Sequence, residues 1–160
     1  MLTVDDLRAF IIRQGIAAEV ILLSVPTPTV SAAAEAVGSA TEQIGKSILF
    51  FVRDAPWLVV ANGLHRLDYK HLGAYFGVNR KQIRLADADQ VAAATGYPAG
   101  ALPPFGHRQA IPTLIEARVL SQSILYAGGG AVNALIRLTP QELQRALKAP
   151  VVDLAERRPS

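Results

Sequence analysis

The stretch KSILFFVRDAPWLVVA, residues 46–61, decides the fold class. The part from Lys46 to Val52 has the length of a β-strand and is strongly apolar beyond its first residues. Trp57 to Ala61 is a second apolar run. Asp54-Ala55-Pro56, which lies between the two runs, has the composition of a turn. The stretch therefore predicts a β-hairpin, the clearest one in the chain.

Short helices and strands are expected to alternate on both sides of this hairpin. A helix is predicted where a capping residue precedes apolar residues at helical spacing, and a strand where a short apolar run lies between turn residues. Interspersed elements of this kind predict an α/β (or α+β) fold with a mixed sheet. The expected helix caps are Thr3, Ser31, Asp68, Asp87 and Thr139, and the expected further strands are 19–23, 82–85, 111–115, 123–127, 134–138 and 151–155.

Length and composition indicate one globular domain. The chain has 160 residues, of which 51% are hydrophobic, so it can bury a single sizeable core. We expect this domain to cover residues 1–160, with a frayed tail at 157–160. The N-terminus is acidic and lacks the basic start of a signal peptide, and the apolar stretch 48–52 is too short to cross a bilayer. The expectation is a cytoplasmic protein without a membrane partner.

Basic residues concentrate in the middle of the sequence. Residues 46–85 hold seven basic and two acidic side chains, a net charge of +5, whereas residues 1–45 have a net charge of −3. A basic segment can bind a polyanion such as RNA, and it can equally be a solvated surface. Charge distribution alone leaves both interpretations open.

Several familiar catalytic sites are excluded by the residues present. The chain has no cysteine, so it can have no thiolate nucleophile and no cysteine-based zinc site. It has no Gly-x-Ser-x-Gly elbow, and its histidines, His65, His71 and His107, lack metal-ligand spacing. No Lys-Ser/Thr pair follows the glycines at 128–130, which predict a hairpin turn and not a phosphate loop. We therefore expect no metal.

Two features are open to a functional interpretation. Lys46 stands at the head of the most apolar strand, where it can simply extend to water or can present a partly desolvated ammonium to an anionic or carbonyl ligand. The loop from Gly96 to Gly106 is rich in glycine and proline. It is either a rigid connector or a pocket wall whose backbone N–H groups approach a ligand.

The run VSAAAEAVG at 30–38, followed by QIGKSILF at 43–50, resembles the YbaK/ProX family and the editing domain inserted in bacterial prolyl-tRNA synthetases. The functional signature of that family is the lysine of the second run, here Lys46. The resemblance covers nearly the whole chain. It continues through RLDYK at 66–70, RLAD at 84–87, a Gly-x-x-x-Pro loop at 100–104, IRLTP at 136–140 and VVDLA at 151–155.

The resemblance implies a mixed, partly closed sheet with flanking helices and a cleft for the terminal adenosine of a tRNA and its esterified amino acid. It implies hydrolysis without a metal or cofactor, with Lys46 as the catalytic residue that contacts the terminal nucleotide. Gly100 and Pro104 are expected to position that nucleotide. Ala127 and Gly128 are further candidates for substrate binding, and Lys70, Arg80, Lys81 and Arg84 are candidates for tRNA binding.

The expected function is therefore trans-editing: an aminoacyl-tRNA deacylase that acts on tRNA for proline carrying a small amino acid, with prolyl-tRNA synthetase as a partner. Gly45 stands where the family commonly has a β-branched residue, and Pro103 and Ala127 stand where its cysteinyl-tRNA deacylase branch has serine. Deacylation of cysteinyl-tRNA is therefore not the expectation. Two alternatives are a non-catalytic module that binds an RNA end or nucleotide, and a protein-interaction domain.

Overall fold

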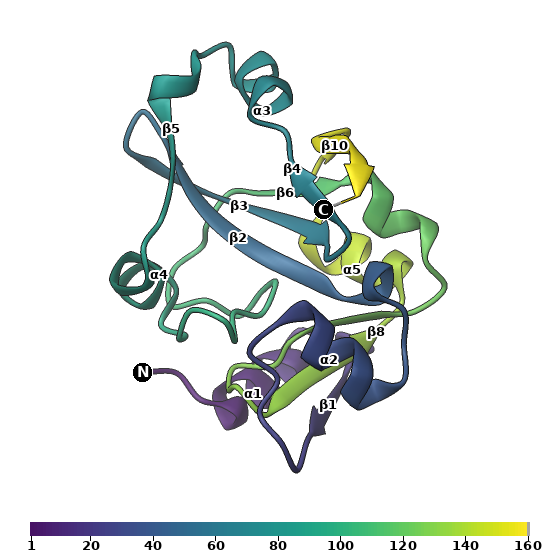
Figure 1. Ribbon diagram of the computed structural model, residues 1–160. Coiled ribbons are helices and arrows are strands. Elements are labelled where there is room, and N and C mark those ends of the chain that lie inside the picture. Colours follow the sequence, from purple (N-terminus) through teal and green to yellow (C-terminus); the bar gives the residue numbers. More distant parts are fainter. Residues whose placement is uncertain (160) are drawn as a thin grey trace.

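The computed structural model describes residues 1–159 (Figure 1). The described chain has five α-helices and ten strands arranged in three sheets. The helices are α1 (Val4–Arg13), α2 (Val30–Val37), α3 (Tyr69–Phe76), α4 (Ala88–Thr95) and α5 (Pro140–Leu147). The strands are β1 (Glu19–Leu22), β2 (Gly45–Val52), β3 (Ala55–Asn62), β4 (His65–Leu67), β5 (Ile83–Leu85), β6 (Thr113–Glu116), β7 (Leu125–Gly128), β8 (Ala134–Leu138), β9 (Val151–Val152) and β10 (Ala155–Pro159).

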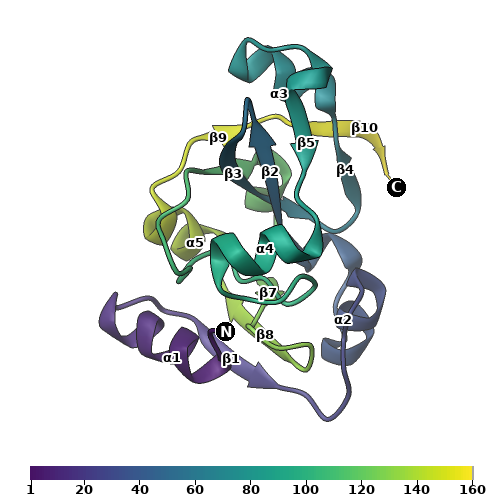
Figure 2. The ribbon, with the colours of Figure 1, turned by 90° about the vertical axis from the view of Figure 1, so that its left-hand side faces the viewer.

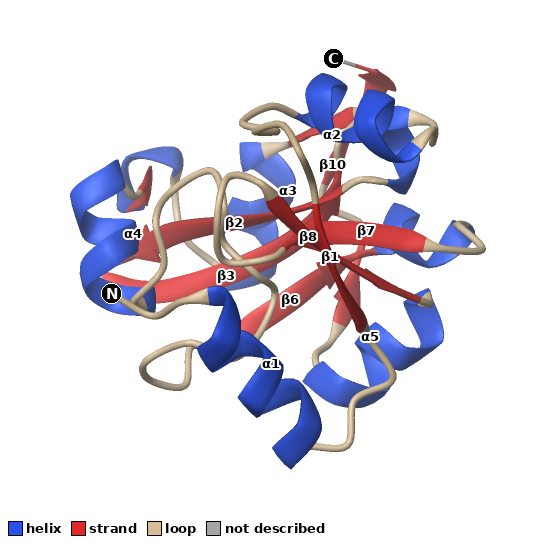
Figure 3. Ribbon diagram, turned by 90° about the horizontal axis from the view of Figure 1, so that it is seen from below, coloured by secondary structure: helices blue, strands red, loops and turns tan. Residues whose placement is uncertain are grey.

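The largest sheet has the order β5-β2-β3-β6-β9 and is mixed. Its β5, β2 and β3 are antiparallel, and β3, β6 and β9 run parallel. A three-stranded antiparallel sheet, β1-β8-β7, lies across it (Figure 3), and β4 pairs with β10 in a small third sheet. The expected fold class, a mixed α/β domain with flanking helices, is confirmed, and the mixed sheet is open.

The predicted hairpin is confirmed, with one shift in its turn. β2 and β3 pair from Gly45↔Asn62 to Val52↔Ala55, so the turn consists of Arg53 and Asp54 alone. Both have positive φ, 48° and 67°, which is the backbone of a two-residue hairpin turn. Ala55 and Pro56, expected in the turn, belong to β3 instead. β6 pairs only with residues 58–60 of β3. The missing N–H of Pro56 therefore removes no hydrogen bond between β3 and β6.

Burial on both faces explains why the sequence of the hairpin is continuously apolar. Successive side chains of a strand point to opposite faces. Leu49 packs into a core with α1 and α5, while Phe50 packs into a second core with Leu72 of α3 and Leu154. Both Leu49 and Phe50 are almost fully buried. A sheet covered on both sides therefore shows no alternation of polar and apolar residues.

Helix starts follow the expected caps with one exception. Ser31 does not cap α2, because the helix begins two residues earlier than expected: Thr29 is the cap, and its hydroxyl accepts a hydrogen bond from the Ala32 N–H at 3.1 Å. The α-helices have eight to ten residues, and none in the described chain could cross a membrane, which takes about 20. The four confirmed caps are Thr3, Asp68, Asp87 and Thr139.

The expected final strand at 151–155 is wrong, because it forms two strands in different sheets. β9 extends the large sheet through Ile115↔Val151, and β10 pairs with β4 through Ala155↔Leu67. At the break, the Leu154 N–H donates to the buried Glu116 carboxylate at 2.8 Å. The tail expected to fray at 157–160 belongs to β10 as far as Pro159, and Ser160 lies outside the described residues.

Candidate functional site

A small cavity lies where β2 begins. It has a volume of about 150 Å³ and is bounded by the start of β2, the loop and first residues of α2, the loop at residues 100–102, and strands β7 and β8. Four residues singled out from the sequence line it together: Lys46, Gly100, Ala127 and Gly128. They come from three segments far apart in the chain, so the fold brings these four expected residues together.

Two local features hold these segments against one another. Ile44, just before β2, forms an isolated bridge with Tyr126, which places β7 beside the start of β2. The Gly130 N–H donates to the Ala101 carbonyl at 2.9 Å, which ties the Gly/Pro-rich loop to the end of β7. A Cβ on Gly128 would lie 2.3 Å from the Leu102 carbonyl oxygen. The loop can therefore approach β7 this closely only because residue 128 is glycine.

The glycines at 128–130 also connect β7 to β8, which pair in antiparallel register from Leu125↔Leu138 to Gly128↔Leu135. The predicted hairpin is thus confirmed, and its turn covers residues 129–133. This hairpin has a second role that its composition did not indicate, since its first glycine also forms part of the cavity wall.

Lys46 is half-buried at the cavity, and its environment disfavours the ammonium. Burial lowers the pKa of Lys46 below its usual value, and the positive charge of Arg66 on β4 lowers that pKa further. Within residues 1–159, no carboxylate lies within ion-pair distance of Lys46. A cation that is partly desolvated and unpaired in this way is suited to bind a phosphate or carbonyl oxygen of a ligand.

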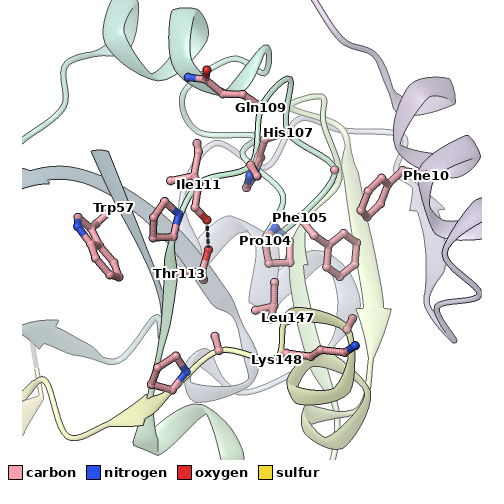
Figure 4. Close-up of a pocket in the computed structure, with 16 residues that line it drawn as sticks. Phe10, Trp57, Pro104, Phe105, His107, Gln109, Ile111, Thr113, Leu147 and Lys148 are labelled. Atoms are coloured by element: carbon pink, nitrogen blue, oxygen red, sulfur yellow. Dashed lines mark hydrogen bonds between the residues drawn. The ribbon is translucent and has the colours of Figure 1, made fainter. Parts of the chain in front are cut away.

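Pro104 is not brought to this cavity. It is buried and lines a larger one, of about 550 Å³, together with Phe10, Trp57 and His107 (Figure 4). The Nε2 of His107 lies 2.7 Å from the Pro103 carbonyl oxygen, and burial lowers the pKa of the imidazole. Gly100 and Pro104 therefore face different cavities although only three residues separate them. The role of Pro104 in substrate binding stays a prediction.

The four candidate tRNA-binding residues lie away from the cavity, near the other end of β2. Lys70 and Arg80 line a wide depression of about 890 Å³ beside α3, and Lys81 is exposed next to them. The Arg84 guanidinium lies 4.4 Å from the centre of the Phe51 ring. Figures 1 and 2 show α3 and β5 at the top of the molecule, above α2 and β8.

The separation can be estimated along the strand. Phe51, under Arg84, is five residues from Lys46 on β2, or roughly 17 Å at about 3.3 Å per residue. Arg84 therefore cannot contact the same small group as Lys46, and none of the four basic residues lines the Lys46 cavity. They could contact a different part of one large ligand.

Sequence reasoning missed several residues of the cavity. Thr27 and Thr29 belong to a loop that the sequence shows only as proline-rich, and Arg66 acts on Lys46 from β4, a strand that was not expected. Ser47, which also lines the cavity, follows Lys46 directly in the sequence, and this proximity was the one signal that could have indicated it. In residues 1–159, no three His, Asp or Glu side chains gather as they would to hold a metal ion.

The aminoacyl-tRNA editing domain is the family whose model matches this chain, over residues 24–146. A solved structure described as a "putative trans-editing enzyme for prolyl tRNA synthetase" is 31% identical, with a TM-score of 0.89, and the match covers 98% of this chain and 99% of that one. The hypothetical protein APE2540 is also 31% identical, with a TM-score of 0.87 over 94% of this chain and 99% of its own. The uncharacterized protein YwhH of Bacillus subtilis (strain 168) is 30% identical over 116 residues, 72% of each chain.

The matched residues include Lys46, the other three candidates that share its cavity, and all four basic residues near α3. The similarity to the solved structures extends over nearly the entire chain, so fold and sequence agree. The chain belongs to the aminoacyl-tRNA editing domain family.

Proposed function

We propose that this chain is a trans-editing deacylase that hydrolyses the ester between tRNA for proline and a small, wrongly attached amino acid. The observation that carries the proposal is the gathering of Lys46, Gly100, Ala127 and Gly128 around one small cavity in a chain of the editing family. The similarity to the solved structure described as a "putative trans-editing enzyme for prolyl tRNA synthetase" supports the choice of tRNA and the synthetase as a partner. A protein with this substrate would work in the cytoplasm.

The size of the cavity supports a small amino acid. A protein cavity of about 150 Å³ holds a group of the size of benzene. The cavity beside Lys46 has this volume, so it can take a small side chain but not a nucleoside as well. Val30, Ala33 and Leu135 give it apolar walls. The terminal adenosine would then lie outside, at the mouth.

The chemistry needs little beyond positioning. An aminoacyl ester is already activated, and holding it next to a water or the neighbouring ribose hydroxyl can supply much of the rate. The Lys46 ammonium would stabilise the phosphate or the oxyanion that develops at the ester carbon. None of the residues that line the cavity is a histidine or a carboxylate. We therefore assign no general base to the protein.

The proposal is tested with a panel of mischarged tRNAs. Alanyl and seryl esters of tRNA for proline should be hydrolysed faster than esters of bulky amino acids, because a whole alanyl or seryl group fits the cavity of about 150 Å³ and an aminoacyl group larger than benzene exceeds it. The same assay with added prolyl-tRNA synthetase tests the partner. If every ester stays intact at micromolar protein, the chain is instead a module that binds an RNA end without hydrolysing it.

We predict that the activity is unaffected by chelators. The residues that line the cavity include no histidine, aspartate or glutamate, the side chains that usually bind metal ions in a chain without cysteine. Deacylation should proceed at the same rate with and without EDTA. Loss of activity in EDTA that one particular metal restores would contradict the proposed mechanism.

We predict that tRNA binding weakens as salt rises, through Lys70, Arg80, Lys81 and Arg84. Each phosphate contact releases counterions, so removing one phosphate-binding charge should reduce the slope of log K against log salt by roughly 0.7–0.9. Reversing the charge of Lys70 and Lys81 should lower the affinity and flatten the slope. Lys148, which lies beside the 550 Å³ cavity, gives a matched control. If the Lys70/Lys81 variant binds tRNA like the Lys148 variant, this basic surface is only solvated.

A further inference from the structure

Ser47 follows Lys46 on β2 and borders two cavities. One is the 150 Å³ cavity of the candidate site, and the other has a volume of about 190 Å³ and extends along β2. Gly100 and Leu102 also line both. The Ser47 hydroxyl oxygen is buried, and within the described chain it has no hydrogen-bond partner.

A buried hydroxyl without a partner is unfavourable, and nearly all buried polar groups in proteins are paired. The other hydroxyl groups of the cavity wall are paired, that of buried Thr27 and that of exposed Thr29 alike. The Thr27 hydroxyl donates to the Val132 carbonyl oxygen at 3.2 Å, and the Thr29 hydroxyl accepts from the Ala32 N–H as the cap of α2. Thr27 and Thr29 thus stabilise the wall, whereas Ser47 has no such role among the described contacts. A ligand in the cavity would supply the missing partner.

Ser47 does not have the surroundings of a nucleophile. A nucleophilic serine needs an adjacent base. No histidine, aspartate or glutamate lines either cavity, and no hydrogen bond joins Ser47 to Lys46 in the described chain. The nearby charges of Lys46 and Arg66 are positive, so they favour a ligand oxygen over an ammonium group. The hydroxyl is therefore suited to donate a hydrogen bond to an oxygen.

We propose that Ser47 contacts the substrate, its hydroxyl donating a hydrogen bond to an oxygen of the aminoacyl ester beside Lys46. The inference rests on the proposed function and names a second donor for the same site. Serine can change its χ1 rotamer at small cost. A side chain that borders both cavities can thus turn its hydroxyl toward the ester when substrate binds.

The test compares Ser47→Thr with Ser47→Val, since threonine and valine have nearly the same shape and differ in the hydroxyl. The kcat/KM for alanyl-tRNA should stay within a few-fold of wild type in Ser47→Thr and fall on the order of 10²-fold in Ser47→Val, as when one preorganised donor is removed. The valine variant should melt at the same temperature as the threonine variant or higher, because its methyl group replaces an unpaired hydroxyl. A structural role for the hydroxyl would instead lower the melting temperature of Ser47→Val.

Binding of an amide-linked alanyl-adenosine analogue gives a readout that does not need hydrolysis. Tighter binding by Ser47→Thr than by Ser47→Val supports the inference even if wild type hydrolyses nothing, in which case only the proposed function fails. If the two variants have equal kcat/KM and equal affinity, the inference about Ser47 is wrong. The proposed deacylase function still stands in that case, provided that the wild-type protein hydrolyses the ester. If neither variant folds, Ser47→Ala is compared with wild type in kcat/KM and in affinity for the analogue. A loss of both in Ser47→Ala supports the inference, and equal values overturn it.

Discussion

Replacing Lys46 with alanine is expected to lower single-turnover deacylation on the order of 10²-fold or more, the loss seen when one preorganised donor is removed from a transition state. The reason is the environment of the ammonium, which is half-buried, lowered in pKa by desolvation and by Arg66, and without an ion-pair partner in residues 1–159. A charge in such a place interacts with a phosphate or oxyanion more strongly than it could in open water.

The same environment predicts that Lys46→Ala leaves the fold intact. A lysine whose pKa is lowered on folding costs stability at every pH below its ordinary pKa, and in full below the lowered pKa, so its removal should not destabilise the fold. Lys46→Arg should restore activity only in part, because a planar guanidinium presents its donors elsewhere. A thermal melt of each variant accompanies the rate measurement. If activity and melting temperature fall together, Lys46 is a structural residue and the catalytic assignment is wrong.

Replacing Gly128 with alanine is expected to damage both stability and activity. The added Cβ would lie 2.3 Å from the Leu102 carbonyl oxygen and 3.0 Å from the Ala101 carbonyl carbon, both backbone atoms that cannot rotate away. The loop must therefore move, and overpacking of this kind costs about 1–3 kcal/mol. Because Gly100 lies on the same loop, the cavity wall shifts as well. A displacement of about 1 Å at a reacting centre can lower the rate about 10²-fold.

Gly45→Ala is the matched control for Gly128→Ala. Gly45 lines the same cavity, but its Cβ would meet the Tyr126 carbonyl oxygen at 3.7 Å and the Ala127 Cβ at 3.9 Å, which are ordinary contacts. The free energy of unfolding measured in urea should therefore change little in Gly45→Ala, in contrast to Gly128→Ala. If the two variants behave alike, the close approach of the loop to Gly128 does not hold the site in place.

Local signals in the sequence were enough for much of the fold. The expected bounds of β8 and the expected caps of α4 and α5 agree with the structure, because a turn or a capping residue marks each of them. What the sequence could not show depends on distant pairing. β4 has three residues, too few for a pattern, and it exists because β10 pairs with it from the far end of the chain. The same pairing divides the run at 151–155.

The candidate site was predictable to a similar extent. Lys46 and Gly100 followed from the family resemblance, and the structure places both at one cavity. Pro104 follows Gly100 by four residues, but the loop directs it to another cavity, which no motif reveals. Ser47 is next to Lys46 in the sequence, but it was not predicted to join the site, because neighbours on a strand are expected on opposite faces. Only the structure shows that Lys46 and Ser47 border the same cavity.

The central claim is that the cavity beside Lys46 receives the aminoacyl end of tRNA. A crystal structure of the protein with the amide-linked alanyl-adenosine analogue tests it most directly. We predict that the alanyl group occupies the 150 Å³ cavity between Lys46 and Gly128, with the adenosine outside its mouth. An analogue bound instead in the 550 Å³ cavity beside Pro104 and His107 would contradict this assignment.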